Sequence, residues 1–451
     1  MSELPNGWAI ACIGDLADLN PKQACDDEIV AGFVPMSHAP TNFRDKLRFD
    51  ERPWGEIKKA YTNFKDGDVI FAKVTPCFEN GKAAFVEGLP NGVGAGSSEF
   101  FVLRPGCDGV SAKYLLALIK SYGFLRDGSA NMTGAVGLRR VPRQFVESYL
   151  VPVPPAAEQA RIAARLDELL AQVDILKARI GGIPALLKRF RQSVLAVAVS
   201  GQLTEKWRSS LDTAKPLASW KNCKIGDISS LVTSGSRGWA DYYSDSGAIF
   251  IRSQDINTDE LEISDTAFVK LPGSSEGKRT RVQYQDILLT ITGANVGKVA
   301  RVKQQIPEAY VSQHVALVRL YKPEYAPFIE LFLKDIGSGR GVLLDLAYGG
   351  GKPGLNLSNI RDLLLPLPPI EEQIEIIRRV EQLFAFADQL EANVTKAQSR
   401  IDLLTQSILA KAFRGKLVPQ DLNDEPASIL LERIKVKRTV PSKAKRRSKS
   451  F

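Results

Sequence analysis

The chain contains one long stretch of sequence twice. Residues 151–159 (VPVPPAAEQ) return as residues 365–373 (LPLPPIEEQ), and the offset of 214 residues (365 − 151) continues downstream without a gap. The residues of the first copy that recur unchanged at this offset are Ile162, Arg165, Leu169, Ala171, Asp174, Leu176, Ala178, Gln192, Ser193, Leu195, Ala196, Ala198, Gly201 and Leu203. Solenoid repeats have periods of about 20–50 residues. The sequence therefore indicates the duplication of one large unit.

A fainter match extends each copy upstream. Trp8 followed by residues 13–16 (IGDL) corresponds to Trp220 followed by residues 225–228 (IGDI). Between such anchors the halves differ in sequence and length, and 451 residues are too many for one ordinary core. The segments that we predict are a first variable domain (1–150), a helical segment (151–212), a second variable domain (213–364), a second helical segment (365–431) and a basic tail (432–451).

The helical segments have the apolar spacing of a coiled coil. The apolar positions of the first copy are Ile162, Leu166, Leu169, Val173, Leu176, Ile180, Ile183, Leu187, Phe190, Val194 and Val197. Those of the second are Ile376, Val380, Leu383, Ala387, Leu390, Val394, Ala397, Ile401, Leu404 and Ile408. Steps of four and three alternate in both, as at the a and d positions of a heptad. We expect the copies to pair antiparallel, with an approximate two-fold relation between the halves. The alternative is that each helix packs only on its own domain.

Proline pairs begin both helices, with Glu158 or Glu372 in the favourable first turn. In the first copy, residues 181–184 (GGIP) should kink or briefly break the helix. The second copy has TKAQ at the matching place and should be straighter.

Both variable regions have the pattern of α+β domains. The first has short apolar runs at 68–73, 83–86 and 100–103, with a helix expected around 112–121. The second has runs at 249–252, 287–292, 299–302 and 315–320, with a helix expected around 327–335. Glycine-rich turns separate these short strands.

These turns provide the candidate nucleic-acid contacts. Glycine lets a backbone approach a phosphate, lysine supplies charge, asparagine can pair with adenine, and arginine can reach guanine or phosphate. The loops are 75–82, 131–141, 234–239, 292–298 and 349–356. The candidate side chains on them are Asn80, Lys82, Arg139, Arg140, Ser236, Arg237, Asn295, Lys298 and Lys352. The alternative is ordinary hairpin turns with solvated lysines.

The net charge of +9 is located in the tail. Nine of the 60 basic residues follow Glu432, so 51 remain in residues 1–432 against all 51 acidic residues. The folded body is therefore neutral, and its charge gives no argument for DNA binding. We expect the tail itself to be disordered.

Composition excludes several other classes. No apolar run approaches the ~20 residues of a membrane span, and the first residues do not resemble a signal peptide, so we expect a cytoplasmic protein without membrane contact. Five scattered cysteines and two histidines favour reduced thiols and no metal site.

Three segments of the chain resemble nucleotide-binding or catalytic motifs, but none has the residues that the motif requires. Residues 293–298 (GANVGK) are one residue short of a nucleotide-binding P-loop and are followed by valine. Residues 20–22 (NPK) lack the second proline and aromatic residue of an adenine-methyltransferase motif, and 79–82 (ENGK) has the wrong spacing for a nuclease core. We therefore expect a chain that is not itself an enzyme.

Taken together, these features resemble the specificity subunit of a Type I restriction–modification system. The resemblance covers nearly the whole chain. Its most specific parts are the helix starts at 154–159 and 368–373, the segment 189–195, and residues 404–415 (LTQSILAKAFRG). Residues 78–82 (FENGK) and 98–100 (SEF) also resemble part of a target-recognition domain of that family.

The resemblance implies a sequence-specific, non-catalytic DNA-binding subunit. Its partners would be double-stranded DNA, two methyltransferase subunits and, through the complex, motor–nuclease subunits. The chain would bind no cofactor, whereas the complex would use S-adenosylmethionine, ATP and Mg²⁺. Each domain would read half of a split target, and the helices would set the gap and dock partners. The residues assigned to spacing and docking are Pro155, Glu158, Gln159, Leu169, Leu176, Pro369, Glu372, Gln373, Leu383 and Leu390.

Because the helical segments match while the domains differ, we expect two different half-sites and hence an asymmetric target. Two alternatives have different partners. One is a stand-alone or architectural DNA-binding protein, and the other is a coiled-coil adaptor that does not touch DNA.

Overall fold

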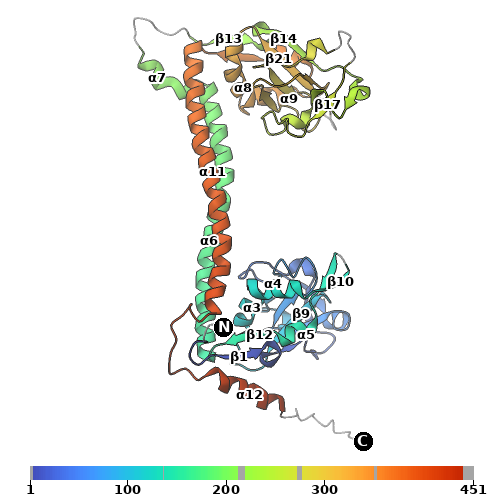
Figure 1. Cartoon of the computed structure of the whole chain (residues 1–451), viewed down its shortest axis with the longest axis vertical. Helices are drawn as coiled ribbons and strands as arrows, with labels where there is room; N and C mark the ends of the chain where they lie inside the picture. The colour runs from blue at the N-terminus through green and yellow to red at the C-terminus, as the bar shows by residue number, and fades with distance from the viewer. Residues whose placement is uncertain (1–3, 136, 212–218, 272–276, 350–352, 440–451) are drawn as a thin grey trace. The chain divides into compact units, whose positions relative to one another are not determined.

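The structure is a computed structural model that describes the chain except residues 1–3, 136, 212–218, 272–276, 350–352 and 440–451 (Figure 1). It divides into two compact units. The terminal unit comprises residues 1–181 and 395–451, and the central unit comprises residues 182–394.

The variable domain of the terminal unit is built from two four-stranded sheets. One sheet has the order β2 (Ala17–Leu19), β9 (Phe100–Pro105), β6 (Val69–Ala72) and β7 (Ala83–Phe85). The other has the order β4 (Asp50–Pro53), β3 (Val30–Val34), β8 (Val93–Gly96) and β5 (Thr62–Lys65). Only β3 and β8 pair in parallel among these strands. Helices α3 (Ala112–Ile119) and α4 (Tyr122–Ala130) follow the last strand.

The central unit repeats the topology of the first sheet and shares the parallel pair of the second, whose edge strands differ. Its first sheet has the order β14 (Ser229–Ser234), β21 (Val315–Leu320), β18 (Ile287–Thr290) and β19 (Val299–Arg301). Its second has the order β15 (Tyr243–Ser244), β17 (Ala267–Val269), β16 (Ala248–Ile251) and β20 (Ala309–Val311), with β16 and β20 parallel. Helices α8 (Ala326–Lys334), α9 (Gly339–Leu346) and α10 (Leu357–Arg361) follow. The expected α+β duplication is confirmed.

A two-stranded ribbon leads from each domain into its repeat helix. β1 (Ala9–Cys12) pairs with β12 (Leu150–Val153), which precedes α6 (Ala156–Val199). β13 (Lys221–Lys224) pairs with β22 (Leu364–Leu367), which precedes α11 (Ile370–Ala412). The proline pairs end these strands, because proline cannot donate a ladder hydrogen bond.

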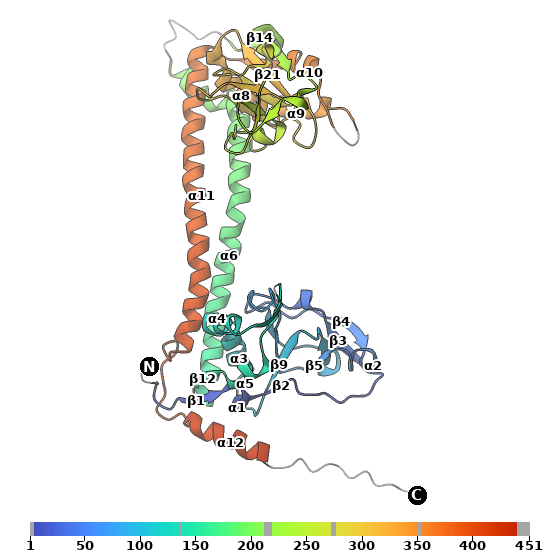
Figure 2. The same ribbon diagram turned by 45° about the vertical axis from the view of Figure 1, so that its right-hand side comes forward.

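In both units α6 and α11 lie side by side and run in opposite directions (Figures 1 and 2). In the terminal unit, Lys177 of α6 pairs with Asp402 of α11 at 2.8 Å. In the central unit, Arg191 pairs with Asp388 at 2.6 Å. The apolar contacts in the terminal unit join Ile162, Leu166 and Val173 to Ile401 and Ile408. The expected antiparallel pairing is confirmed, and the alternative of two separate helices is wrong.

Two details of the helices differ from expectation. The helix α6 is continuous through residues 181–184, so of the predicted kink or brief break the break is wrong, and the kink stays a prediction. A proline inside a helix removes one backbone hydrogen bond, and the turns on either side can still form theirs. At the seam, Leu169, Leu383 and Leu390 are only half-buried, and Leu176 is 42% exposed. A pair of helices covers a narrow stripe, so an apolar seam position need not be fully buried.

The first part of the basic tail, up to Thr439, is folded as the end of a helix. Helix α12 (Ala427–Thr439) packs Ala427, Leu430 and Ile434 into the core of the first domain. The expectation of disorder from residue 432 is therefore wrong as far as Thr439, because these three residues share one helical face. The rest of the tail, 440–451, lies outside the described residues. None of the helices in the described ranges could span a membrane, because none combines sufficient length with a sufficiently apolar sequence.

Candidate nucleic-acid interface

Two loops of the first domain that are far apart in sequence form one surface. The first is the turn 75–82, and the second is the hairpin of β10 (Thr133–Ala135) and β11 (Leu138–Arg140). The backbone N–H of Thr75 donates to the carbonyl of Arg139, and the N–H of Arg139 donates to Thr75 Oγ1, both at 3.0 Å. These bonds bring the predicted residues Asn80, Arg139 and Arg140 into one region.

Both arginines of this surface are paired with carboxylates. Arg140 donates to both carboxylate oxygens of Glu99, at 2.9 and 2.7 Å. The hydrogen bond from Arg140, with a further contribution from Lys73, lowers the pKa of Glu99 against the opposing effect of burial. Arg139 lies 3.5 Å from Glu79. The arginine side chains remain 46% and 43% exposed, so they could exchange these partners for phosphate or a base edge.

Lys82 is less exposed than its position on a predicted surface turn suggests. Its ammonium is half-buried and donates to the backbone carbonyl of Met36 at 2.9 Å. Lys82 therefore anchors the turn from inside, whereas Asn80 on the same turn is exposed. A contact of Lys82 with phosphate stays a prediction and would require its ammonium to leave this carbonyl.

The second domain joins the corresponding loops in the same way. The N–H of Gly293 donates to the carbonyl of Pro353 at 3.0 Å, and the N–H of Leu355 donates to the carbonyl of Ile291 at 2.8 Å. Thr292 also forms a β-bridge with Gly354. Of the residues predicted here, Lys352 lies outside the described residues.

Asn295 and Lys298 are half-buried and engaged within the second domain. The side-chain amide of Asn295 donates to the carbonyl of Ser253 at 3.4 Å. Lys298 pairs with Asp259 at 3.4 Å, and Arg340 contacts the same carboxylate. As with Lys82, these contacts fix the turn, and neither side chain is free to meet a ligand without leaving its partner.

Ser236 and Arg237 are exposed on the loop that follows β14. Ser236 lines a cavity of about 350 Å³. The aromatic side of this cavity is formed by Trp239, Tyr243 and Phe250, with Trp239 stacked on Phe250 at 5.4 Å between ring centroids. Gln313 and His314 line the same cavity and lie in the turn between β20 and β21. Neither residue was among the candidates predicted from sequence. Comparison of the two domains could have indicated them, because this turn corresponds to residues 97–99 of the first domain, where Glu99 lies.

The glutamates at the helix starts are buried and bonded within the chain. The indole N–H of Trp8 donates to Glu158, and that of Trp220 donates to Glu372, both at 2.9 Å. Both glutamates are buried. These hydrogen bonds fasten each helix to the start of its own domain. The assignment of the two glutamates to spacing and docking stays a prediction.

The neighbouring glutamines have the same structural role. Gln159 accepts from the backbone N–H of Ser111 at 2.9 Å and donates to the carbonyl of Pro154 at 3.0 Å. Gln373 donates to the carbonyl of Pro368 at 2.8 Å. Both glutamines and Pro155 are buried, and Pro369 is half-buried. Among the described residues, no cluster of histidine, cysteine and carboxylate side chains could hold a metal ion.

Comparison with known proteins agrees with this arrangement. The chain matches the family model of the Type I restriction modification DNA specificity domain twice, over residues 5–185 and 218–398. The EcoBI specificity subunit of Escherichia coli is 37% identical over 350 residues, which are 73% of this chain and 73% of that protein. The EcoKI specificity subunit of Escherichia coli K12 is 34% identical over 460 residues, covering 97% and 96% of the two chains.

The fold is shared with a solved structure of low sequence identity. The crystal structure of the HsdS subunit from Thermoanaerobacter tengcongensis has a TM-score of 0.60 at 19% identity, covering 92% of this chain and 98% of that chain. The duplicated α+β domains and the twofold match to the family model define a two-domain DNA specificity protein. The chain belongs to the family of Type I restriction–modification specificity subunits.

Proposed function

We propose that the chain reads an asymmetric DNA target in two parts, with residues 1–150 reading one half and residues 213–364 the other. One observation supports this most directly. Both domains join two recognition loops through backbone hydrogen bonds, around Thr75 in the first and Gly293 in the second. The side chains on these matched loops differ, so the same framework presents a different chemical surface in each domain.

The exposed side chains suggest which residues would meet DNA. Asn80 can pair with the edge of an adenine, and Arg139 and Arg140 can reach guanine or phosphate once they leave their carboxylates. In the second domain, Ser236 and Arg237 are the exposed candidates, on the loop after β14 and beside the cavity that Gln313 and His314 line. In that domain Lys352 is a further candidate from sequence.

The repeat helices would dock the partner subunits. Ser193 and Ser407 are identical residues at matched positions, and both are exposed, as are Ala178 and Ala392. These residues are identical in both copies although they are exposed and do not contribute to the core. This is what two equivalent docking surfaces would require. Two methyltransferase subunits would bind there, and motor–nuclease subunits would join through them. The complex would use S-adenosylmethionine, ATP and Mg²⁺, and the helices would set the gap between the half-sites.

Sequencing of modified adenines in DNA from cells with the complete system tests this proposal. The expected result is one motif with two different defined halves and a fixed gap. A palindromic motif, or modification that does not depend on this chain, would contradict it.

A further inference from the structure

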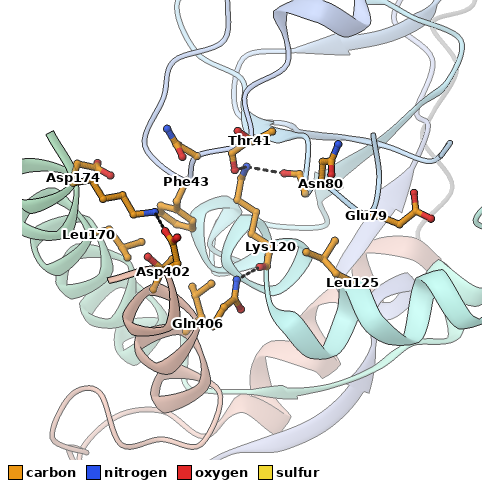
Figure 3. Close-up of a pocket in the computed structure, with 15 residues that line it drawn as sticks. Thr41, Phe43, Glu79, Asn80, Lys120, Leu125, Leu170, Asp174, Asp402 and Gln406 are labelled. Atoms are coloured by element: carbon orange, nitrogen blue, oxygen red, sulfur yellow. Dashed lines mark hydrogen bonds and ion pairs between the residues drawn. The ribbon is translucent and has the colours of Figure 1, made fainter. Parts of the chain in front are cut away.

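Lys120, directly after α3, is buried with 5% of its surface exposed. Its ammonium donates to three backbone carbonyls: Thr41 at 2.8 Å, Gly81 at 2.9 Å and Pro40 at 3.3 Å. Figure 3 shows the side chain of Lys120 directed toward Thr41 and Asn80. A buried lysine is costly because the charge leaves water, and it is seldom found without partners. Here its donors are directed at loop backbone.

The three carbonyls belong to two different segments of the first domain. Gly81 is in the candidate recognition turn, next to the exposed Asn80. Pro40 and Thr41 are in the segment that also receives the N–H of Ala83, which donates to the carbonyl of Pro40 at 3.1 Å. Lys120 therefore fixes the turn against this second segment. A flexible loop does not hold a base-reading side chain in one position. The hydrogen bonds from Lys120 reduce the conformational freedom of the turn that carries Asn80.

The same residue is also connected to the repeat helix α11. The carbonyl of Lys120 accepts from the side-chain amide of Gln406 at 3.4 Å, and the N–H of Tyr122 donates to Gln406 Oε1 at 2.8 Å. All these residues belong to the terminal unit. Figure 3 shows Gln406, Lys120 and Asn80 around one cavity of about 270 Å³. A short series of contacts thus leads from α11 through Lys120 to the turn.

We propose that Lys120 is a positioning residue that holds the recognition turn 75–82 in register with α11, and so sets base discrimination in the half-site read by the first domain. This inference rests on the proposed function. It assigns no contact with DNA to Lys120, which is buried beneath the turn. Its effect on discrimination acts through the backbone of Gly81 and the adjacent Asn80.

The test compares Lys120→Met with Lys113→Met in the complete complex. Methionine keeps the length of the side chain and removes the three donors. Lys113 lies on α3 and pairs with Asp167 of α6, without contact to the turn, so its variant controls for loss of a lysine on this helix. Gln406→Leu is a milder variant that removes only the connection to α11.

Binding is measured on duplexes with the mapped target and on duplexes with one base pair changed in either half-site, below the melting temperature of each variant. We expect Lys120→Met to reduce discrimination in the first half-site about tenfold and to leave the second within twofold, with no change in Lys113→Met. Gln406→Leu should reduce first-half discrimination about threefold, which keeps the test decisive if Lys120→Met does not fold.

Unchanged discrimination in folded Lys120→Met, an equal loss in both half-sites, or unchanged discrimination in Gln406→Leu would overturn the inference. A lower melting temperature with intact discrimination would also overturn it, because this is the result of a purely structural role. If the wild-type complex shows no sequence preference, the proposed function itself fails.

Discussion

The indole N–H of Trp8 donates to Glu158 across 150 residues of sequence, at 2.9 Å. Trp220 and Glu372 form the same bond, at the same distance, in the second copy. The duplication therefore preserved the point at which each domain is fastened to its helix. The surroundings of the two glutamates are not equal, since Glu372 Oε1 also accepts from Thr204 at 2.7 Å and contacts Arg208. Glu158 Oε1 is buried without a partner among the described residues.

This difference predicts unequal effects of one substitution. Burial raises the pKa of Glu158 against the opposing effect of the Trp8 hydrogen bond. The charge of Glu158 is therefore unfavourable above its ordinary pKa, and Glu158→Gln should leave the melting temperature unchanged or raise it at pH 7. Glu372→Gln should destabilise the central unit by about 1–3 kcal/mol, because it weakens a charge-assisted bond. Equal losses in thermal unfolding of the two variants would contradict this account.

The docked helix α12 predicts a measurable contribution of the C-terminal segment. Leu430 is 2% exposed in the core of the first domain. Leu430→Ala should lower the free energy of unfolding of the terminal unit by about 2–4 kcal/mol, through lost burial and the cavity left behind. Val436, on the same helix, is 62% exposed, so Val436→Ala is the matched control and should have little effect. Denaturant unfolding of both variants measures this, and equal stability would show that α12 is not docked.

A pH dependence follows from the buried ammonium of Lys120. Burial lowers its pKa to about 7 from an ordinary value of 10.5, with a smaller opposing effect of Asp45. Between these values the unfolded chain binds more protons than the folded one, so the free energy of unfolding should rise with pH from about 7 to about 10. In Lys120→Met this part of the rise should be absent. Unfolding midpoints of both proteins across this range measure it, and identical slopes would contradict the assignment.

The duplicated exposed serines predict the stoichiometry of docking. Ser193→Arg and Ser407→Arg should each remove one methyltransferase subunit from the complex, because a bulky charge disrupts one of two equivalent surfaces. Gln389→Arg is the control, since Gln389 is exposed and its matched position holds isoleucine, Ile175. Native mass spectrometry of the purified complexes gives the subunit count. Retention of both subunits in both serine variants would exclude these positions from docking.

The sequence could predict the repeat, its two long helices, α3, α8 and the more apolar strands of each domain, because each depends on local periodicity or on direct comparison of the two halves. It did not predict the remaining short strands and helices. It could not predict that the backbone of Thr75 meets that of Arg139, since this contact joins segments that only the fold brings together. For the same reason Lys82 and Lys298 resembled free phosphate ligands, although both bind groups within their own domain. The apolar face of α12 formed by Ala427, Leu430 and Ile434 was not predicted, because basic residues lie between and after these three.

The candidate site was predicted less completely than the fold. The sequence indicated the loops, but it did not show that Arg139 and Arg140 are paired with Glu79 and Glu99. It also gave no reason to select Lys120, because one lysine near the end of an apolar helix is usually solvated. Its role is visible only when the three carbonyls that surround it are known.

The exchange of one domain tests whether each domain reads its own half of the target. Residues 1–150 would be replaced by the first domain of another specificity subunit that recognises a different sequence, and modified adenines would be mapped in cells with the complete system. We expect a new sequence in one half-site, with the other half-site and the gap unchanged. A change in both half-sites, or in neither, would contradict the claim that each domain reads its own half of the target.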